Sequence, residues 1–242
     1  MNAIKLSLPY RSLAALSFLA STDETRQHIC CVNMSWRGPT ELLLVATDGR
    51  RIGFLRETLT EPVAEFAPFS ITSELIRLLD RSADLRILHE LADRHGMEYW
   101  DEPALPNPNA RVFVGCDIYA GILSLTLGRI TYQESLVRAA FPDMRSVLLT
   151  ASAAPLAREH VTINPRLLAD FSKVADALGC PNCGTALTMV GSHDAHSGVP
   201  AVIRVTLPET PNFFGCLMPI RQTDESKREQ VGEVPAWLKL ES

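Results

Sequence analysis

A short strand, an amphipathic helix and several further strands follow one another three times along the 242-residue sequence. Alternation of apolar and polar residues indicates the strands, and apolar residues three or four positions apart indicate the helices. A recurring unit of this kind is typical of an internal structural repeat. The sequence therefore predicts an α+β fold of three βαβββ-type units, in which helices pack on antiparallel sheets.

The third unit has the clearest helix signals. Asn164 is suited to the N-cap, Pro165 to the first helical position and Gly179 to the C-terminal end. The other helices are predicted over 9–20 and after Thr72 or Ser73. The strands are predicted within 4–8, 28–36, 40–57, 84–91, 110–118, 122–130, 132–139, 185–191, 201–207 and 213–220. The polar, proline-containing segment 93–109 has no clear period and is predicted to be an insertion or loop.

Composition limits the class of protein. The chain has 46% apolar and 21% charged residues, no apolar run long enough to span a membrane and no secretory leader at its N-terminus. We therefore expect a cytoplasmic protein with no membrane partner and with its six cysteines reduced. The net charge of −5 argues against a protein that coats nucleic acid over its whole surface. One local basic face remains compatible with that charge, because screening acts over roughly 8 Å at physiological salt.

The stretch "VATDGRRIGFL" (45–55) predicts a β-hairpin, because Asp48 and Gly49 stand between two apolar runs. A tight turn needs no cation, yet Arg50 and Arg51 follow directly. Solvated strand residues are the ordinary interpretation of such a pair.

Three segments of the chain combine into a more specific signal: "VATDGRRI" (45–52), "YQESLVRAAFPDMRSVL" (132–148) and "CLMPIR" (216–221). In this order they resemble the bacterial DNA polymerase III β subunit, the sliding clamp. The first is similar to that family's A-T-D-G-H-R-L hairpin, the second to its strand ending in F-P-D-Y-R-R-V-L, and the third to its closing V-M-P-M-R. The resemblance covers residues 3–221 and implies the clamp (processivity-fold) architecture and a role in DNA replication.

The resemblance also implies that these segments converge at a cleft that receives short peptides from DNA polymerases and other partners. The implied cleft residues are Arg50, Ile52, Pro142, Val147, Leu217, Met218, Pro219 and Ile220. Aliphatic side chains there would form an apolar floor for leucine or phenylalanine anchors, and a cation at the rim would bind the peptide's polar groups. Two departures concern this cleft: Arg50 stands where the family commonly has histidine, and Ser146 where it commonly has arginine.

The chain is shorter than a full clamp chain, which has three domains of two units each. Residues 1–150 are predicted to form one complete clamp-like domain, 151–221 a half-domain and 222–242 a C-terminal tail. A lone half-domain exposes a helix flank and a sheet edge. The sequence therefore predicts a homo-oligomer, in which two chains pair their third units or four chains supply enough units for a ring.

Contact with double-stranded DNA is implied through helices that line the central hole of a clamp. The cations on predicted helices are Arg11, Arg77, Arg81, Arg166 and Lys173. Such cations bind phosphates without reading bases, so the expected DNA binding is independent of sequence. The alternative for each of them is an ordinary solvated helix surface.

A zinc site is a competing hypothesis for one part of the chain. Cys180 and Cys183 form a C-x-x-C pair, and His193 and His196 form an H-x-x-H pair nine residues further on. Two thiolates and two imidazoles are a suitable ligand set for zinc, although the spacing is shorter than in the usual finger. On this hypothesis the chain is a small zinc-dependent protein.

Catalytic motifs are not found in the sequence: it has no G-x-S-x-G elbow, no phosphate-binding glycine loop and no H-E-x-x-H. We therefore predict a non-catalytic replication accessory protein with no cofactor, which binds partner peptides in the cleft and contacts DNA. The alternative is a clamp-like adaptor or decoy for such peptides that does not encircle DNA.

Overall fold

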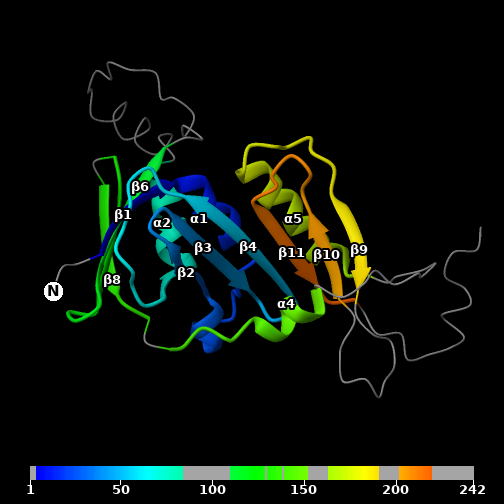
Figure 1. Cartoon of the computed structure of the whole chain (residues 1–242), viewed down its shortest axis with the longest axis horizontal. Helices are drawn as coiled ribbons and strands as arrows, with labels where there is room; N and C mark the ends of the chain where they lie inside the picture. Colours follow the sequence, from blue (N-terminus) through cyan, green and yellow to red (C-terminus); the bar gives the residue numbers. More distant parts are fainter. Residues whose placement is uncertain are drawn as a thin grey trace, which may run out of the picture.

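A computed structural model describes residues 4–83, 110–128, 130–137, 139–151, 163–190 and 202–219 (Figure 1). The strands are β1 (Ile4–Pro9), β2 (Cys31–Gly38), β3 (Glu41–Thr47), β4 (Arg51–Thr58), β5 (Phe69–Thr72), β6 (Arg111–Asp117), β7 (Ile122–Leu127), β8 (Ile130–Ser135), β9 (Ala186–Val190), β10 (Val202–Thr206) and β11 (Phe213–Leu217). The helices are α1 (Tyr10–Ser17), α2 (Ser73–Ala83), α4 (Arg145–Ala151) and α5 (Pro165–Ala177), and η1 (Glu24–Ile29) is a 3₁₀ segment. None of the described helices is both long and apolar enough to cross a membrane.

The strands form two antiparallel sheets. The four-stranded sheet has the order β1-β6-β7-β8, and the seven-stranded sheet has the order β5-β2-β3-β4-β11-β10-β9. The larger sheet joins the first and third units, because β11 pairs with β4 at its centre. The predicted α+β class, with helices packed on antiparallel sheets, is confirmed.

The first two units exchange strands. β1 precedes α1 in the chain but pairs with β6 of the second unit, with Leu6 opposite Val114. β5 precedes α2 but pairs with β2 of the first unit, with Val32 opposite Ile71. The phenolic hydroxyl of Tyr10 on α1 also donates to the carbonyl of α2 residue 76 at 3.0 Å. The two units therefore share one core instead of folding side by side.

The main core lies between the helices and the large sheet. Leu13 and Leu16 of α1 and Phe171 and Val174 of α5 are fully buried in it. A smaller apolar cluster covers the opposite face of the same sheet, where Phe141, Met144 and Val147 pack on β4, β10 and β11. The large sheet is thus covered on both faces where β4 meets β11.

Two glycines permit the close approach of helices at this junction. Gly53 of β4 and Gly215 of β11 lie opposite each other in the antiparallel register. A Cβ atom on Gly215 would lie 2.5 Å from Cε1 of Phe171, and one on Gly53 would overlap the side chain of Leu19. Any larger residue at either position would push α5 or the end of α1 off the sheet.

Some predicted boundaries are corrected by the structure. The first helix ends at Ser17 instead of extending to residue 20, and the strand predicted over 132–139 is β8, which ends at Ser135. Helix α4 was not predicted, and it places Val147 on a helical turn. α5 follows its signals closely: Asn164 accepts a hydrogen bond from the Arg166 amide at 3.0 Å, and Gly179 has a φ of +87°. The predicted segments 84–91 and 93–109 and the tail 222–242 lie outside the described residues.

Candidate functional site

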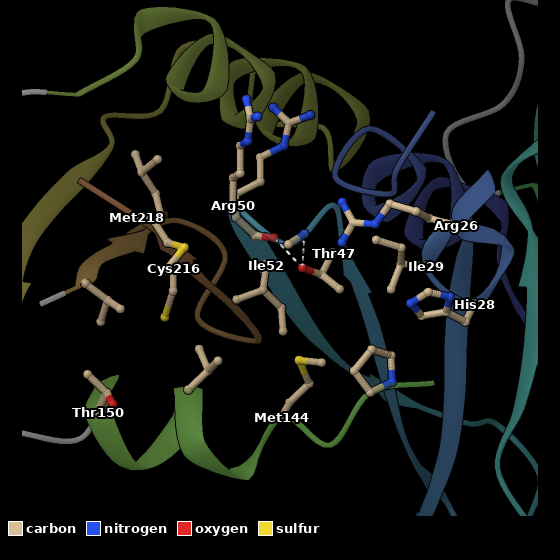
Figure 2. Close-up of a pocket in the computed structure, with 16 residues that line it drawn as sticks. Arg26, His28, Ile29, Thr47, Arg50, Ile52, Met144, Thr150, Cys216 and Met218 are labelled. Carbon is tan, nitrogen blue, oxygen red and sulfur yellow. Dashed lines mark hydrogen bonds between the residues drawn. The ribbon is translucent and has the colours of Figure 1, made fainter. Parts of the chain in front are cut away.

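A pocket of about 380 Å³ lies where β4 meets β11, on the face of the large sheet that α4 covers (Figure 2). Its walls come from η1, the β3–β4 turn, the segment leading into α4, and strands β10 and β11. The lining residues are Arg26, His28, Ile29, Thr47, Gly49, Arg50, Arg51, Ile52, Pro142, Met144, Val147, Thr150, Val202, Cys216, Leu217 and Met218. A volume of this size is typical of pockets that take ligands or peptide side chains.

Six of the eight residues that the resemblance assigned to a cleft line this one pocket, although they come from segments up to 168 positions apart, Arg50 to Met218. They are Arg50, Ile52, Pro142, Val147, Leu217 and Met218. Pro219 is described but does not line the pocket, and Ile220 lies outside the described residues. Peptide binding by these residues stays a prediction.

The β3–β4 turn is shifted by one residue from its predicted position. Thr47 pairs with Ile52, so Gly49 and Arg50 are the two central residues of the turn. Gly49 has a φ of +88°, and positive φ at only the first central position is typical of a type II′ turn. Asp48 instead accepts hydrogen bonds through Oδ1 from the amides of Arg50 at 2.8 Å and Arg51 at 3.0 Å. Its carboxylate therefore stabilises the turn from the position before the two central residues.

The two adjacent arginines of this turn have different roles. The side chain of Arg51 is only 9% exposed. Its guanidinium forms an ion pair with Asp170 of α5, lies 3.2 Å from Oδ2 of Asp48, and donates to the carbonyl oxygens of Phe18 at 3.1 Å and Leu167 at 3.4 Å. Arg51 thus ties the turn to α1 and α5.

Arg50, by contrast, is exposed at the rim of the pocket. Its carbonyl oxygen accepts a hydrogen bond from the amide of Met218 at 2.8 Å, which continues the β4–β11 ladder. The interpretation of both arginines as solvated strand residues is therefore wrong for Arg51.

Two ionisable groups at the site have shifted pKa values. Burial alone would raise the pKa of Asp170, but hydrogen bonds and charges from Lys173 and Arg51 outweigh it and hold the pKa below its usual value. Burial raises the pKa of the Cys216 thiol to about 12, against a smaller opposing effect of Arg204. The Cys216 thiol is therefore a neutral, unreactive group among the aliphatic side chains that line the pocket.

Comparisons with known proteins were made at the level of sequence and of structure. No family model matches the sequence, and no curated protein matches it. Solved structures do match. The β subunit from DNA polymerase of Streptococcus pyogenes aligns with a TM-score of 0.51 at 14% identity, over 92% of this chain and 66% of that one. The DNA polymerase sliding clamp from Pseudomonas aeruginosa aligns with a TM-score of 0.54 at 15% identity, over 90% of this chain and 67% of that one.

The chain has the sliding-clamp fold. At these identities the likeness shows the fold alone, and it confirms the predicted clamp architecture. The chain spans about two thirds of the length of these clamp subunits.

Within the sliding-clamp fold, the helices predicted to contact DNA form a continuous layer, in which α1 packs against both α2 and α5. Arg77 is exposed on α2, Arg166 is exposed on α5 and Arg11 is half-buried on α1. Lys173 is exposed on α5, but its Nζ lies 2.5 Å from Oδ1 of Asp170. The side chain of Arg81 lies outside the described part of the structure. DNA binding by these cations stays a prediction.

Only two of the four predicted zinc ligands, Cys180 and Cys183, lie in the described part of the structure. Cys180 and Cys183 lie in the turn after α5, where the Cys183 amide donates to the Cys180 carbonyl at 3.1 Å. The Cys180 thiol lies 2.9 Å from the Thr210 hydroxyl. Burial and the neighbouring Cys180 raise the pKa of the Cys183 thiol. His193 and His196 lie outside the described residues, so the four-residue site stays a prediction.

Several residues of the pocket are not predicted from the sequence. Arg26, His28 and Ile29 belong to η1, more than 15 positions before the hairpin, and nothing in their local pattern indicates a binding wall. Val202 and Cys216 were predicted only as strand residues. The alternation of β10 and β11 indicates which of their residues share a face, but only the β4–β11 pairing brings that face to Ile52 and the cavity.

Proposed function

We propose that this chain is a non-catalytic, sliding-clamp-like replication accessory protein of the cytoplasm. On this proposal it binds linear peptides of DNA polymerases and other DNA-processing partners in the pocket, and it contacts duplex DNA through its helix layer. The observation that carries the proposal is the convergence of the turn at Arg50 and Ile52, the segment 142–147 and strand β11 on one apolar pocket. The sliding-clamp fold supports it.

The apolar character of the pocket suits peptide anchors. Ile29 and Ile52 are almost fully buried at its floor, Pro142 and Val147 are half-buried, and Met218 is 44% exposed at its edge. An exposed methionine is adaptable and able to pack on different apolar partners. A leucine or phenylalanine side chain entering here would be removed from water, which is the main favourable contribution to such binding.

Peptide binding is tested with a fluorescein-labelled peptide that carries leucine and phenylalanine anchors, measured by fluorescence anisotropy on the full chain. Met218→Glu should weaken binding by about tenfold or more, because it places a charge at the apolar edge of the pocket. Leu149→Glu is the matched control, since Leu149 is 75% exposed on α4 and does not line the pocket. Equal affinities for both variants and the wild type would refute peptide binding at this site.

DNA contact is tested separately by retention on linear duplex at several salt concentrations. We expect weak, sequence-independent binding that falls as salt rises. Charge reversal at Arg77 and Arg81 should reduce it, while circular dichroism shows an intact fold. Unchanged retention would contradict the role proposed for these two residues.

A second candidate function is a clamp-like adaptor that binds the same peptides without encircling DNA. The observation that favours it concerns the described cations of the helix layer: Arg11 is half-buried and Lys173 pairs with Asp170, so neither is fully available to phosphates. Light scattering at high micromolar concentration separates the two candidates. We expect a homo-oligomer if chains complete a ring, and a strict monomer would support the adaptor.

A further inference from the structure

The rim of the pocket is positively charged, and no carboxylate of the described residues lines it. The sixteen lining residues include three arginines and, within the described part of the chain, no aspartate or glutamate. Among the carboxylates beside the lining, Asp48 caps the turn amides and contacts Arg51, Asp170 pairs with Arg51 and Lys173, and Asp143 lies 3.9 Å from Arg145. A carboxylate that enters the cavity with a ligand would therefore meet cations and no lining carboxylate.

Arg26 and Arg50 are the cations at the edge of this lining, and the charge of Asp23, just before η1, acts on Arg26. Both side chains are exposed, and Figure 2 shows them on the side of the pocket opposite Met144 and Thr150. Arg26 donates one hydrogen bond, from Nη1 to the Asp48 carbonyl at 3.0 Å. The guanidinium of Arg50 has no ion pair within the described residues. Because a guanidinium has five N–H donors, both groups keep donors for a carboxylate.

The turn holds Arg26 in place against the pocket. A Cβ atom on Gly49 would lie 2.8 Å from Nη2 of Arg26, so the guanidinium packs directly on the backbone of this glycine. Arg26 comes from η1 and Arg50 from the turn itself, so two separate segments place cations at one rim. Such an arrangement recognises an acidic group that lies beside apolar anchors.

We infer that the preferred occupant of the pocket is an acidic linear peptide, whose apolar anchors enter the cavity while an adjacent aspartate or glutamate pairs with Arg26 and Arg50. This inference rests on the proposed function, since it specifies the chemistry of the peptide that the pocket takes. Duplex DNA is the less suitable ligand for this rim. Its phosphates would meet the two arginines, but they would leave the apolar floor uncovered.

The test uses two labelled peptides on the full chain. One is Ser-Asp-Leu-Ser-Leu-Phe-Asp-Ser, and the other has asparagine in place of both aspartates. We expect the acidic peptide to bind about fivefold more tightly at low salt, and the difference to shrink as salt rises. The combined variant Arg26→Gln, Arg50→Gln should bind the acidic and the neutral peptide with equal affinity, because the two guanidinium groups that distinguish them are gone.

The matched control is Arg56→Gln. Arg56 is exposed on β4, and its substitution by glutamine removes one positive charge, as each substitution at the rim does. Because Arg56 does not line the pocket, the preference for the acidic peptide should persist. Equal binding of both peptides to the wild type would overturn the inference and leave the proposed function intact. No binding of either peptide would refute the proposed function itself. Displacement of the acidic peptide by duplex DNA, with the neutral peptide retained, would assign the rim to nucleic acid and also overturn the inference.

Discussion

Removal of the Arg51 side chain is the most direct test of how the pocket is held together. Arg51→Met keeps the aliphatic stem and deletes the guanidinium, and with it the ion pair to Asp170 and the hydrogen bonds to Phe18 and Leu167. These contacts connect the β3–β4 turn with α1 and α5. The variant therefore tests whether a single buried cation fixes the first unit against the third.

The expected loss of stability depends on which contacts Asp170 and Asp48 retain once the Arg51 guanidinium is removed. Breaking a buried ion pair by removing one partner typically costs about 3–5 kcal/mol when the other charge is left alone. Asp170 is not left alone, because Lys173 stays 2.5 Å away, and Asp48 keeps two backbone amides. We therefore expect a loss of about 2 kcal/mol in the free energy of unfolding.

Urea unfolding monitored by circular dichroism measures this loss. Asp170→Asn should cost less, about 1 kcal/mol, because Arg51 keeps the carbonyl acceptors; the double variant should show a coupling of about 1 kcal/mol. Arg145→Met is the matched control. The Arg145–Asp143 pair is 3.9 Å long with side chains 88% and 71% exposed, so its removal should change stability by less than about 0.5 kcal/mol. Equal losses in Arg51→Met and Arg145→Met would refute the reasoning.

Three further predictions concern the turn and two buried groups. Gly49→Ala should destabilise the protein more than Gly128→Ala, because both glycines have positive φ but only a Cβ on Gly49 would strike Arg26; equal thermal shifts would contradict this. Burial raises the pKa of Glu57 above its ordinary 4.5, so the folded state binds more protons there and loses stability as pH rises. The free energy of unfolding of Glu57→Gln should therefore rise relative to that of the wild type as the pH increases from 4.5 to 7. A difference between the two proteins that does not change with pH would contradict this. Cys216, with a pKa of about 12, should resist iodoacetamide at pH 8 in the folded protein and react after unfolding, as followed by mass spectrometry.

Much of the fold follows from local sequence signals. The alternation in 4–8 and 110–118 gives β1 and β6, and Asn164, Pro165 and Gly179 define α5 because each has a physical preference for its position. The pocket residues from three distant segments were found through motif resemblance rather than periodicity. Side-chain pattern shows which face of a strand is buried, but it does not show which strands meet.

The strand exchange between units illustrates this limit. The alternation in β1 would be the same whether β1 paired with its own unit or with β6, because period two reports the face and not the edge. For the same reason, the local sequence pattern does not indicate that η1 contributes to the pocket. Arg26 and His28 are polar residues in an irregular segment, and only the tertiary pairing of β2, β3 and β4 brings them to the cavity. The predicted turn position was one residue too early because of Asp48. This residue type suits the centre of a turn, but Asp48 precedes the two central residues and accepts hydrogen bonds from the amides of Arg50 and Arg51.

The pocket and the β4–β11 junction depend on each other. The Met218 amide bonds to the Arg50 carbonyl at 2.8 Å, so two lining residues belong to the ladder that joins the first and third units. Lining residues come from both sides of this ladder, so an opening of the ladder would separate them. A ligand that binds only the closed form stabilises it in proportion to the logarithm of its concentration over Kd. Conversely, any opening of the junction lowers the apparent affinity by the fraction of closed molecules. Arg51 acts on both equilibria, because it holds the junction closed without occupying the space that a peptide would fill.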